Sequence, residues 1–297
     1  MQARFCGAWL DFHPGSRRES GNRPYIRNRG RLRLAHHQEG KHKAMQYVLH
    51  ESDTIIEGKT FSGDLYARAI HPDGRPWHTF RTYTLLADGN HMIFRRCRIE
   101  NTAGHQKEKG QGIALYLDGD DILVEDCEIR GEQDTLFLAP LPPKEREKDG
   151  FLGPKQFEPR TPRRVHFKRC LIEGGVDFIF GGAEAYFDDC EFRNVAEGYV
   201  FAPSTPEGQA NGFVARNCRF TAGPGVADGT CYIARPWRKF AKVRLENCYL
   251  GLHINPAGWD DWGKTDAHGT IRFVEKGSFG PGYCPESRPD YVTIEEA

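Results

Sequence analysis

Two aspartates occupy equivalent places in two similar segments of the chain. The segments CEIRGEQD, from Cys127, and CLIEGGVD, from Cys170, both read C-x-I-x-G-x-x-D, so Asp134 and Asp177 each follow a cysteine by seven residues. Asp177 also interrupts the apolar run VDFIF, where an isolated buried carboxylate would cost several kcal/mol or take up a proton. A pair of carboxylates with separated pKa values is suited to acid–base or nucleophilic chemistry.

A repeat marked by cysteine indicates which elements position these residues. Short alternating stretches such as HMIF and RVHF precede each cysteine, and such alternation is typical of strands. An in-register column of small apolar thiols predicts an all-β, single-stranded right-handed parallel β-helix of the pectate-lyase-like kind. An antiparallel sandwich and a set of disulfides are the alternatives. The six segments are RRCRIEN, EDCEIRG, KRCLIEG, DDCEFRN, RNCRFTA and ENCYLGL.

The repeat predicts that the two aspartates are neighbours. Equivalent positions on adjacent coils of stacked strands lie about 4.8 Å apart. Two carboxylates that close would share a proton and separate their pKa values. A pair of loop-capping aspartates is the alternative interpretation.

A proline-rich segment separates the second and third cysteine segments. Between Leu138 and Val165 the chain reads APLPPKEREKDGFLGPKQFEPRTPRR, a composition incompatible with a central strand or helix. Long loops on a repeat scaffold often form a wall of a binding site.

Five ordered motifs identify a family resemblance. GQGIALYL, GEQDTLFL, GGVDFIFGGA, YIARPW and PAGWDDW occur in that order. Together they resemble the signature segments of pectin methylesterases, which are carbohydrate esterases on a right-handed parallel β-helix. The resemblance runs from about Phe80 to Trp262. APLPPKE and GPKQF in the proline-rich loop resemble the bacterial branch of that family.

The resemblance implies a hydrolase that removes methyl esters from galacturonate units and releases methanol. Asp177 would be the nucleophile, and Asp134 the general acid and then the base. Gln111 and Gln133 would hold the oxyanion, and Arg235 would bind Asp177 and keep it ionised. The chemistry is consistent, because neutral amides stabilise an oxyanion without titrating, and a neighbouring guanidinium favours a charged carboxylate.

The resemblance also implies substrate contacts. Trp237 would stack on a sugar ring, and Trp259 is expected to do the same. Phe180 and Tyr199 are candidates for lining the cleft. The implied partner is pectin or a methylated oligogalacturonide, and no metal or organic cofactor is implied.

Other functions on the same architecture are alternatives. A polygalacturonase-like glycosidase could use two carboxylates, but it would not explain the glutamines or Arg235. A pectate lyase would need a calcium-binding acidic cluster, and the acidic pairs in this sequence are dispersed. A non-catalytic polysaccharide-binding β-helix is the third alternative.

Composition sets the remaining expectations. Lys plus Arg and Asp plus Glu both number 41, so no global charge attracts nucleic acid or a membrane surface. Residues 1–44 carry ten Lys or Arg against three acids, which indicates a disordered or non-native extension before a catalytic domain at 45–297. The sequence as written shows no signal peptide, which predicts a cytoplasmic protein, or a secreted one if the true N-terminus differs. We also expect a monomer.

Overall fold

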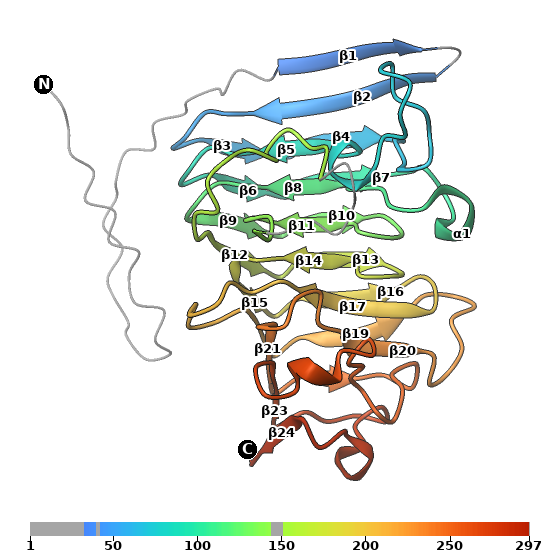
Figure 1. Cartoon of the computed structure of the whole chain (residues 1–297), viewed down its shortest axis with the longest axis vertical. Coiled ribbons are helices and arrows are strands. Elements are labelled where there is room, and N and C mark those ends of the chain that lie inside the picture. The colour runs from blue at the N-terminus through green and yellow to red at the C-terminus, as the bar shows by residue number, and fades with distance from the viewer. Residues whose placement is uncertain (1–32, 40–41, 144–150, 297) are drawn as a thin grey trace, which may run out of the picture.

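The chain winds into a coil whose strands stack along one long axis (Figure 1). The structure, a computed structural model, describes residues 33–39, 42–143 and 151–296. Three sheets run the length of the stack, and the chain passes from sheet A to B to C and then begins the next coil. Among the described strands, every paired strand except the β1–β2 hairpin is parallel to its neighbours, which confirms the predicted right-handed parallel β-helix and excludes the antiparallel sandwich.

The strands are short and the helices shorter. Sheet A contains β1 (Arg33–Glu39), β2 (His42–Leu49), β5 (Leu85–Ala87), β8 (Leu115–Leu117), β11 (Leu136–Leu138), β14 (Ile179–Gly181), β17 (Gly198–Pro203) and β20 (Cys231–Ala234). Sheet B contains β3 (Ile55–Glu57), β6 (Ile93–Arg95), β9 (Ile122–Glu125), β12 (Arg164–Lys168), β15 (Glu184–Asp188), β18 (Phe213–Arg216), β21 (Lys242–Glu246), β23 (Arg272–Lys276) and β24 (Val292–Glu295). Sheet C contains β4 (Thr60–Gly63), β7 (Arg98–Asn101), β10 (Glu128–Arg130), β13 (Leu171–Gly174), β16 (Glu191–Asn194), β19 (Arg219–Ala222) and β22 (Tyr249–Leu250). The helices are α1 (Gln106–Lys109), η1 (Thr79–Arg81), η2 (Thr265–Ala267) and η3 (Pro285–Ser287).

The predicted extension at the start of the chain is only partly covered by the described residues. Residues 1–32 lie outside the described residues, whereas β1 and the beginning of β2 fall within the predicted extension 1–44. The boundary at Met45 falls inside β2, so the division into extension and domain stays a prediction. None of the helices in the described parts of the chain has the length and apolar character to cross a bilayer.

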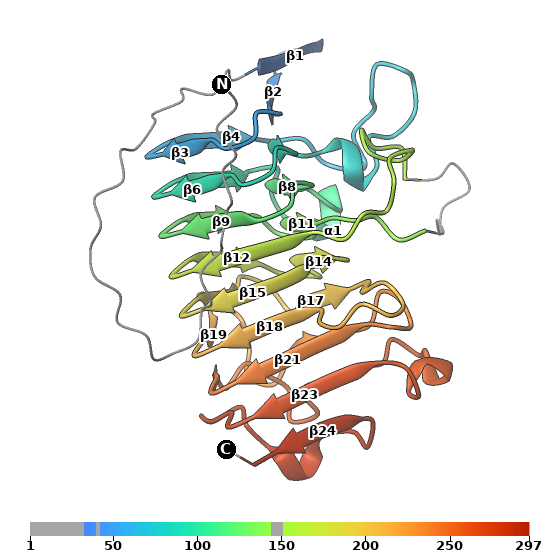
Figure 2. The ribbon, with the colours of Figure 1, turned by 90° about the vertical axis from the view of Figure 1, so that its left-hand side faces the viewer.

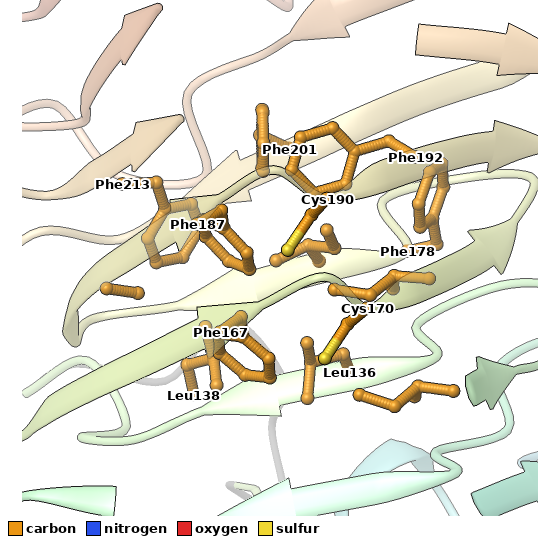
Figure 3. Packing of buried hydrophobic residues seen from close by; sticks show 14 of the residues in the cluster. Leu136, Leu138, Phe167, Cys170, Phe178, Phe187, Cys190, Phe192, Phe201 and Phe213 are labelled. Carbon is orange, nitrogen blue, oxygen red and sulfur yellow. The ribbon is translucent and has the colours of Figure 1, made fainter. Parts of the chain in front are cut away.

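The thiols form the predicted interior column. Each of the six cysteines is at most 2% exposed, and the strands that follow them pair in register, as in Glu128↔Leu171 and Leu171↔Glu191. They are free cysteines, which excludes the disulfide alternative for them, and burial raises the pKa of Cys170 and Cys218. Figure 3 shows Cys170 and Cys190 stacked beside phenylalanines that fill the coil.

The residue before each of these cysteines makes the turn from sheet B to sheet C. Its φ lies between 49° and 55°, the left-handed region that non-glycine residues enter only in special positions. The six residues are Arg96, Asp126, Arg169, Asp189, Asn217 and Asn247. Aspartate and asparagine tolerate this conformation best, and the arginines show that the stacked register imposes it on other residue types as well.

The strands of sheet B stack in one column (Figure 2), and one position on its outer face carries side chains of alternating charge. Each member is the register partner of the next, and ion pairs such as Arg95–Glu125 at 2.9 Å and Arg216–Glu246 at 3.0 Å join some of them. The column runs Glu57, Arg95, Glu125, Lys168, Asp188, Arg216, Glu246, Lys276 and Glu295. Opposite charges on neighbouring strands favour this pairing. Strands two coils apart carry the same charge at this position, so pairing them directly would bring like charges together.

A buried ion pair closes the C-terminal end of the coil. Glu275 of β23 is 1% exposed and accepts hydrogen bonds from Arg288 Nε at 2.6 Å and from Trp259 Nε1 at 2.7 Å. Arg288 also donates to the carbonyls of Pro256 and Gly282. The C-terminal segment is thus fastened to the last coils from inside.

Replacing this arginine tests the closure. We expect Arg288→Met to lower the free energy of unfolding by about 3–5 kcal/mol, because Glu275 would remain buried without a partner. Arg244→Met is the matched control, since it breaks the partly exposed Arg244–Glu295 pair and should cost at most about 1 kcal/mol. Urea denaturation measures both, and equal losses would contradict a special role for the buried pair.

A paired-carboxylate cleft as the candidate active site

A cavity of about 250 Å³ lies on the outside of sheet A. It combines two carboxyl groups, an arginine and two glutamines with a wall of aromatic rings. Its lining residues are His78, Thr79, Phe80, Gln111, Gln133, Asp134, Phe151, Asp177, Phe180, Ala202, Arg235, Trp237 and Trp262.

The two aspartates occupy the same place on consecutive coils. Asp134 lies two residues before Leu136 and Asp177 two residues before Ile179, and these two strand residues are register partners in β11 and β14. Both aspartates are in left-handed turns, with φ of 61° and 50°. The neighbour predicted from the repeat is therefore present, and Asp177 precedes its strand in a turn where the sequence had suggested the interior of a buried strand.

Arg235 makes the predicted contact with Asp177. Its Nε donates to Oδ1 at 2.8 Å and its Nη2 to Oδ2 at 2.7 Å, a two-point contact between planar groups. Arg235 follows β20, two coils beyond the coil of β14, and its backbone N–H donates to the carbonyl of Phe201 at 3.0 Å. The contact explains how Asp177 can be 7% exposed and still be compensated.

The electrostatic surroundings of the two carboxyl groups differ. Burial and, secondly, the charge of Asp177 raise the pKa of Asp134 well above its usual value, and Arg235 offsets this only through longer-range attraction. Burial also raises the pKa of Asp177, but the Arg235 hydrogen bonds and charge counteract it there, assisted by Lys264. The arrangement therefore favours a protonated Asp134 beside an ionised Asp177.

The glutamines lie next to this pair. Gln111 and Gln133 form a parallel bridge between adjacent coils, and both side chains line the cavity. Gln133 immediately precedes Asp134. Their amide groups supply neutral N–H donors beside the carboxyl groups, which suits an oxygen that becomes negative during a reaction.

Aromatic rings and the proline-rich loop form the apolar wall. Phe80, Phe151 and Phe180 belong to a second apolar cluster outside sheet A, against which Trp237 packs. Phe151 comes from the loop between β11 and β12, so the part of that loop that the structure describes does wall the cavity, as predicted. A salt bridge of 2.7 Å between Lys155 Nζ and Asp88 holds the loop against sheet A.

The structure corrects two of the four predicted substrate contacts. Phe180 and Trp237 line the cavity, but Trp259 does not: it is 1% exposed and stacks on Phe273 inside the coil. Trp259 pairs with Ala234 in a β-bridge that turns its ring inward. Tyr199 lies under the guanidinium of Arg235, whose Cζ is 3.9 Å from the ring centre, and not among the lining residues.

Several lining residues were missed from the sequence. Trp262, in the same PAGWDDW motif as Trp259, is the tryptophan of that motif that lines the cavity, and Phe80 lies at the start of the recognised region. The spacing of the two tryptophans was the available signal, since a residue three positions from an inward residue can face outward. His78 and Thr79 lie at the start of the short helix η1, in a segment with no periodic pattern, and could not have been found that way.

The cavity offers no evident metal site. In the parts of the chain that the structure describes, no group of three or more His, Cys, Asp or Glu side chains is arranged to hold a metal ion. What the arrangement can do chemically is nucleophilic attack by one carboxylate, proton transfer by the other, and stabilisation of an oxyanion by amides.

Comparisons with known proteins give a consistent result. The sequence pattern of the Pectinesterase family matches residues 60–141 and 160–296. Among curated relatives, "Pectinesterase 31" of Arabidopsis thaliana is 31% identical over 71% of this chain and 58% of its own length. "Putative pectinesterase/pectinesterase inhibitor 38" of the same plant is 32% identical over 74% of this chain and 43% of its own length. This chain thus spans only about half the length of these curated relatives.

Solved structures agree on the fold. A pectin methylesterase from Aspergillus niger has a TM-score of 0.66 at 23% identity, covering 85% of this chain and 80% of that one. The carrot pectin methylesterase has a TM-score of 0.65 at 23% identity, covering 89% and 82%. A pectin methylesterase in complex with a hexasaccharide has a TM-score of 0.63 at 21% identity, covering 84% and 81%. At these identities the likeness shows the fold alone.

The raised pKa of Asp134 predicts a pH-dependent stability. A carboxyl whose pKa is higher folded than unfolded stabilises the fold below the unfolded value, about 3.9, and that contribution is lost as pH rises through the folded pKa. We therefore expect Asp134→Asn to be more stable than the parent chain at neutral pH, with the gain vanishing at about pH 4.

Asp126→Asn is the matched control, because Asp126 is also in a left-handed turn but Arg169 lowers its pKa. That variant should lose stability above pH 4 or be unchanged, but not gain. Urea unfolding between about pH 4 and 8 measures both. A gain of the same size in both variants would contradict the assignment.

Proposed function

This chain belongs to the pectinesterase family, and on that premise we propose that it hydrolyses methyl esters of galacturonate units in pectin or oligogalacturonides and releases methanol. The observation that carries the proposal is the arrangement of Asp177, Arg235 and Asp134 beside two glutamines in one cavity. The names of the relatives support the same activity.

In the first half of the reaction, an ionised Asp177 oxygen attacks the ester carbonyl carbon. The carbonyl oxygen becomes an oxyanion that the amide N–H groups of Gln111 and Gln133 stabilise. A protonated Asp134 donates its proton to the departing methoxy oxygen, so methanol leaves and an acyl-enzyme remains on Asp177.

In the second half, Asp134 has lost its proton and acts as a base. It takes a proton from water as the water oxygen attacks the acyl carbon, and the same glutamines stabilise the second oxyanion. Collapse of this intermediate releases the free acid and restores an ionised Asp177 and a protonated Asp134. Both halves need the two pKa values to differ, which is what the geometry favours.

The aromatic wall supports a carbohydrate substrate. Trp237, Phe80 and Phe180 present apolar ring surface beside the polar groups, and the apolar faces of sugar rings pack on such surface. A monomer as the active unit is part of this proposal. The finer assignment to a bacterial branch rests on APLPPKE and GPKQF alone, and the curated relatives reported above are plant proteins.

Loss of the nucleophile is the first test. We expect Asp177→Asn to reduce methanol release from methyl-esterified pectin to background, because an amide cannot form the acyl-enzyme. Asp189→Asn, an aspartate in a left-handed turn far from the cavity lining, is the control and should retain activity.

The same incubation separates the alternatives. Methanol without new reducing ends or unsaturated products supports the esterase. New reducing ends would indicate a glycosidase and unsaturated products a lyase. No product but retained binding of pectin would indicate the non-catalytic β-helix. Methanol release by Asp177→Asn above a tenth of the parent rate would remove Asp177 as nucleophile.

The glutamines give an independent test of the oxyanion assignment. Removing one preorganised donor from an oxyanion site typically costs about 10²–10³ in kcat. We expect Gln111→Ala and Gln133→Ala to fall in this range with little change in KM. A change confined to KM in steady-state assays of methanol release would show that these amides bind substrate and do not stabilise the transition state.

A further inference from the structure

Arg235 reaches Asp177 across an intervening coil. Asp177 precedes β14 and Arg235 follows β20, while β17 lies between these strands in sheet A. Strands two coils apart are separated by about 10 Å, so the guanidinium is carried at the end of a long, flexible side chain. Some other group must hold it in the orientation that presents two N–H donors to the carboxylate.

Two aromatic rings lie against that guanidinium. Its Cζ lies 3.9 Å from the centre of the Tyr199 ring and 3.8 Å from that of the Trp262 ring. At these distances both rings are in direct contact with the guanidinium. The edge with Nε and Nη2 stays free for Asp177, so the face contacts and the ion pair use different parts of the same side chain.

Tyr199 is placed by the coil register. It belongs to β17, whose Phe201 pairs with Ile179, so Tyr199 is the register neighbour of Asp177 in the intervening coil. Tyr232 pairs with Tyr199 in the next coil, and the two rings stack at 5.3 Å with an interplanar angle of 17°. The stacked Tyr232 ring therefore helps to hold the Tyr199 ring in place against Arg235.

Trp262 is placed by a constrained turn. Its φ is 55°, which is an outlier for a bulky residue, and its backbone N–H donates to Asp260 Oδ1 at 2.6 Å. Asp260 N in turn donates to the carbonyl of Ala234 at 3.1 Å, directly before Arg235. Strain of this kind persists where the surroundings enforce it and is concentrated at functional sites.

The turn also brings a second cation to the tryptophan. Lys264 Nζ lies 3.9 Å from the centre of the Trp262 ring and donates to the carbonyl of Pro236. The ring thus contacts two positive groups, both of which favour the ionised form of Asp177, whereas Asp260 opposes it.

We propose that Tyr199 and Trp262 are positioning residues that clamp the guanidinium of Arg235 and hold it edge-on to Asp177 while the cavity admits substrate and water. The assignment rests on the proposed esterase function only for its catalytic consequence. The clamp itself is a property of the ion pair and can be measured without turnover.

The test replaces each ring by a side chain that fills similar space without an aromatic face. We expect Tyr199→Leu and Trp262→Met to move the acid limb of the kcat/KM profile upward by about one pH unit, given the usual strength of cation–π contacts. At pH values below the limb, kcat/KM of each variant for methyl-esterified oligogalacturonide should therefore be about tenfold lower than that of the parent chain. Tyr199→Phe and Trp262→Phe keep a ring and should restore most of the parent profile.

Trp237→Met is the control, because it removes a cavity tryptophan that packs against the apolar wall and does not contact Arg235 in the clamp. It should lower kcat/KM at all pH values without moving the limb. If the limb stays in place in Tyr199→Leu and Trp262→Met, or moves equally in Trp237→Met, the clamp is refuted. Should Trp262→Met fail to fold, the two Tyr199 variants decide the question.

A measurement without substrate separates this proposal from the proposed function. In protein labelled with ¹³C at aspartate Cγ, the signal of Asp177 is identified by its loss in Asp177→Asn, and its titration midpoint is followed in each variant. An upward shift in Tyr199→Leu, reversed in Tyr199→Phe, supports the clamp even if the parent chain releases no methanol. An unchanged midpoint overturns it even if the enzyme is an active esterase.

Discussion

The spacing of about 4.8 Å between equivalent residues of successive coils governs this structure. Small thiols accept that spacing inside the coil, because they fill a narrow column without charge. Opposite charges use it on the outer face of sheet B, where each residue faces a partner of the other sign. On the outside of sheet A, the same spacing brings Asp134 and Asp177 together, and two ionised carboxylates at that distance would repel each other. The register that stabilises the scaffold thus also produces the one unfavourable pair on which the chemistry depends.

That unfavourable pair is resolved asymmetrically. Asp177 has a guanidinium in two-point contact, whereas Asp134 has only the more distant influence of the same arginine. Because both groups are buried, burial alone would favour the protonated form of each. The arginine comes from two coils away and reaches only one of them, so chain topology decides which carboxyl is charged.

The sequence was most informative where side chains repeat with the coil. The cysteine pattern places Asp134 and Asp177 in the same phase, and the register of β11 and β14 confirms that they are neighbours. The partnership of Arg235 with Asp177 could be inferred only through family motifs, since 57 intervening positions carry no local signal of contact. Trp259 shows the limit of such motifs, because the motif marks the loop and backbone pairing determines which tryptophan enters the coil. His78 reaches the cavity through loop packing, including the 2.7 Å bond from Arg81 Nε to the carbonyl of Leu152, and sequence spacing does not encode it.

Two buried arginine–carboxylate pairs in the described part of the chain show what separates a structural pair from a functional one. The side chains of Arg288 and Glu275 are 1% and 0% exposed, and carbonyl oxygens and the indole of Trp259 occupy their remaining hydrogen-bonding capacity. Arg235 and Asp177 have the same chemistry, but aromatic faces replace carbonyl oxygens around the guanidinium, and the carboxylate borders a cavity. The ring contacts leave Nε and Nη2 of Arg235 bonded to the carboxylate, so the negative charge is compensated and still borders the cavity. Trp259 and Trp262 connect the two pairs, because they lie three residues apart in one short loop. The Trp259 ring points into the coil and bonds to Glu275, whereas the Trp262 ring lies against Arg235 at the cavity.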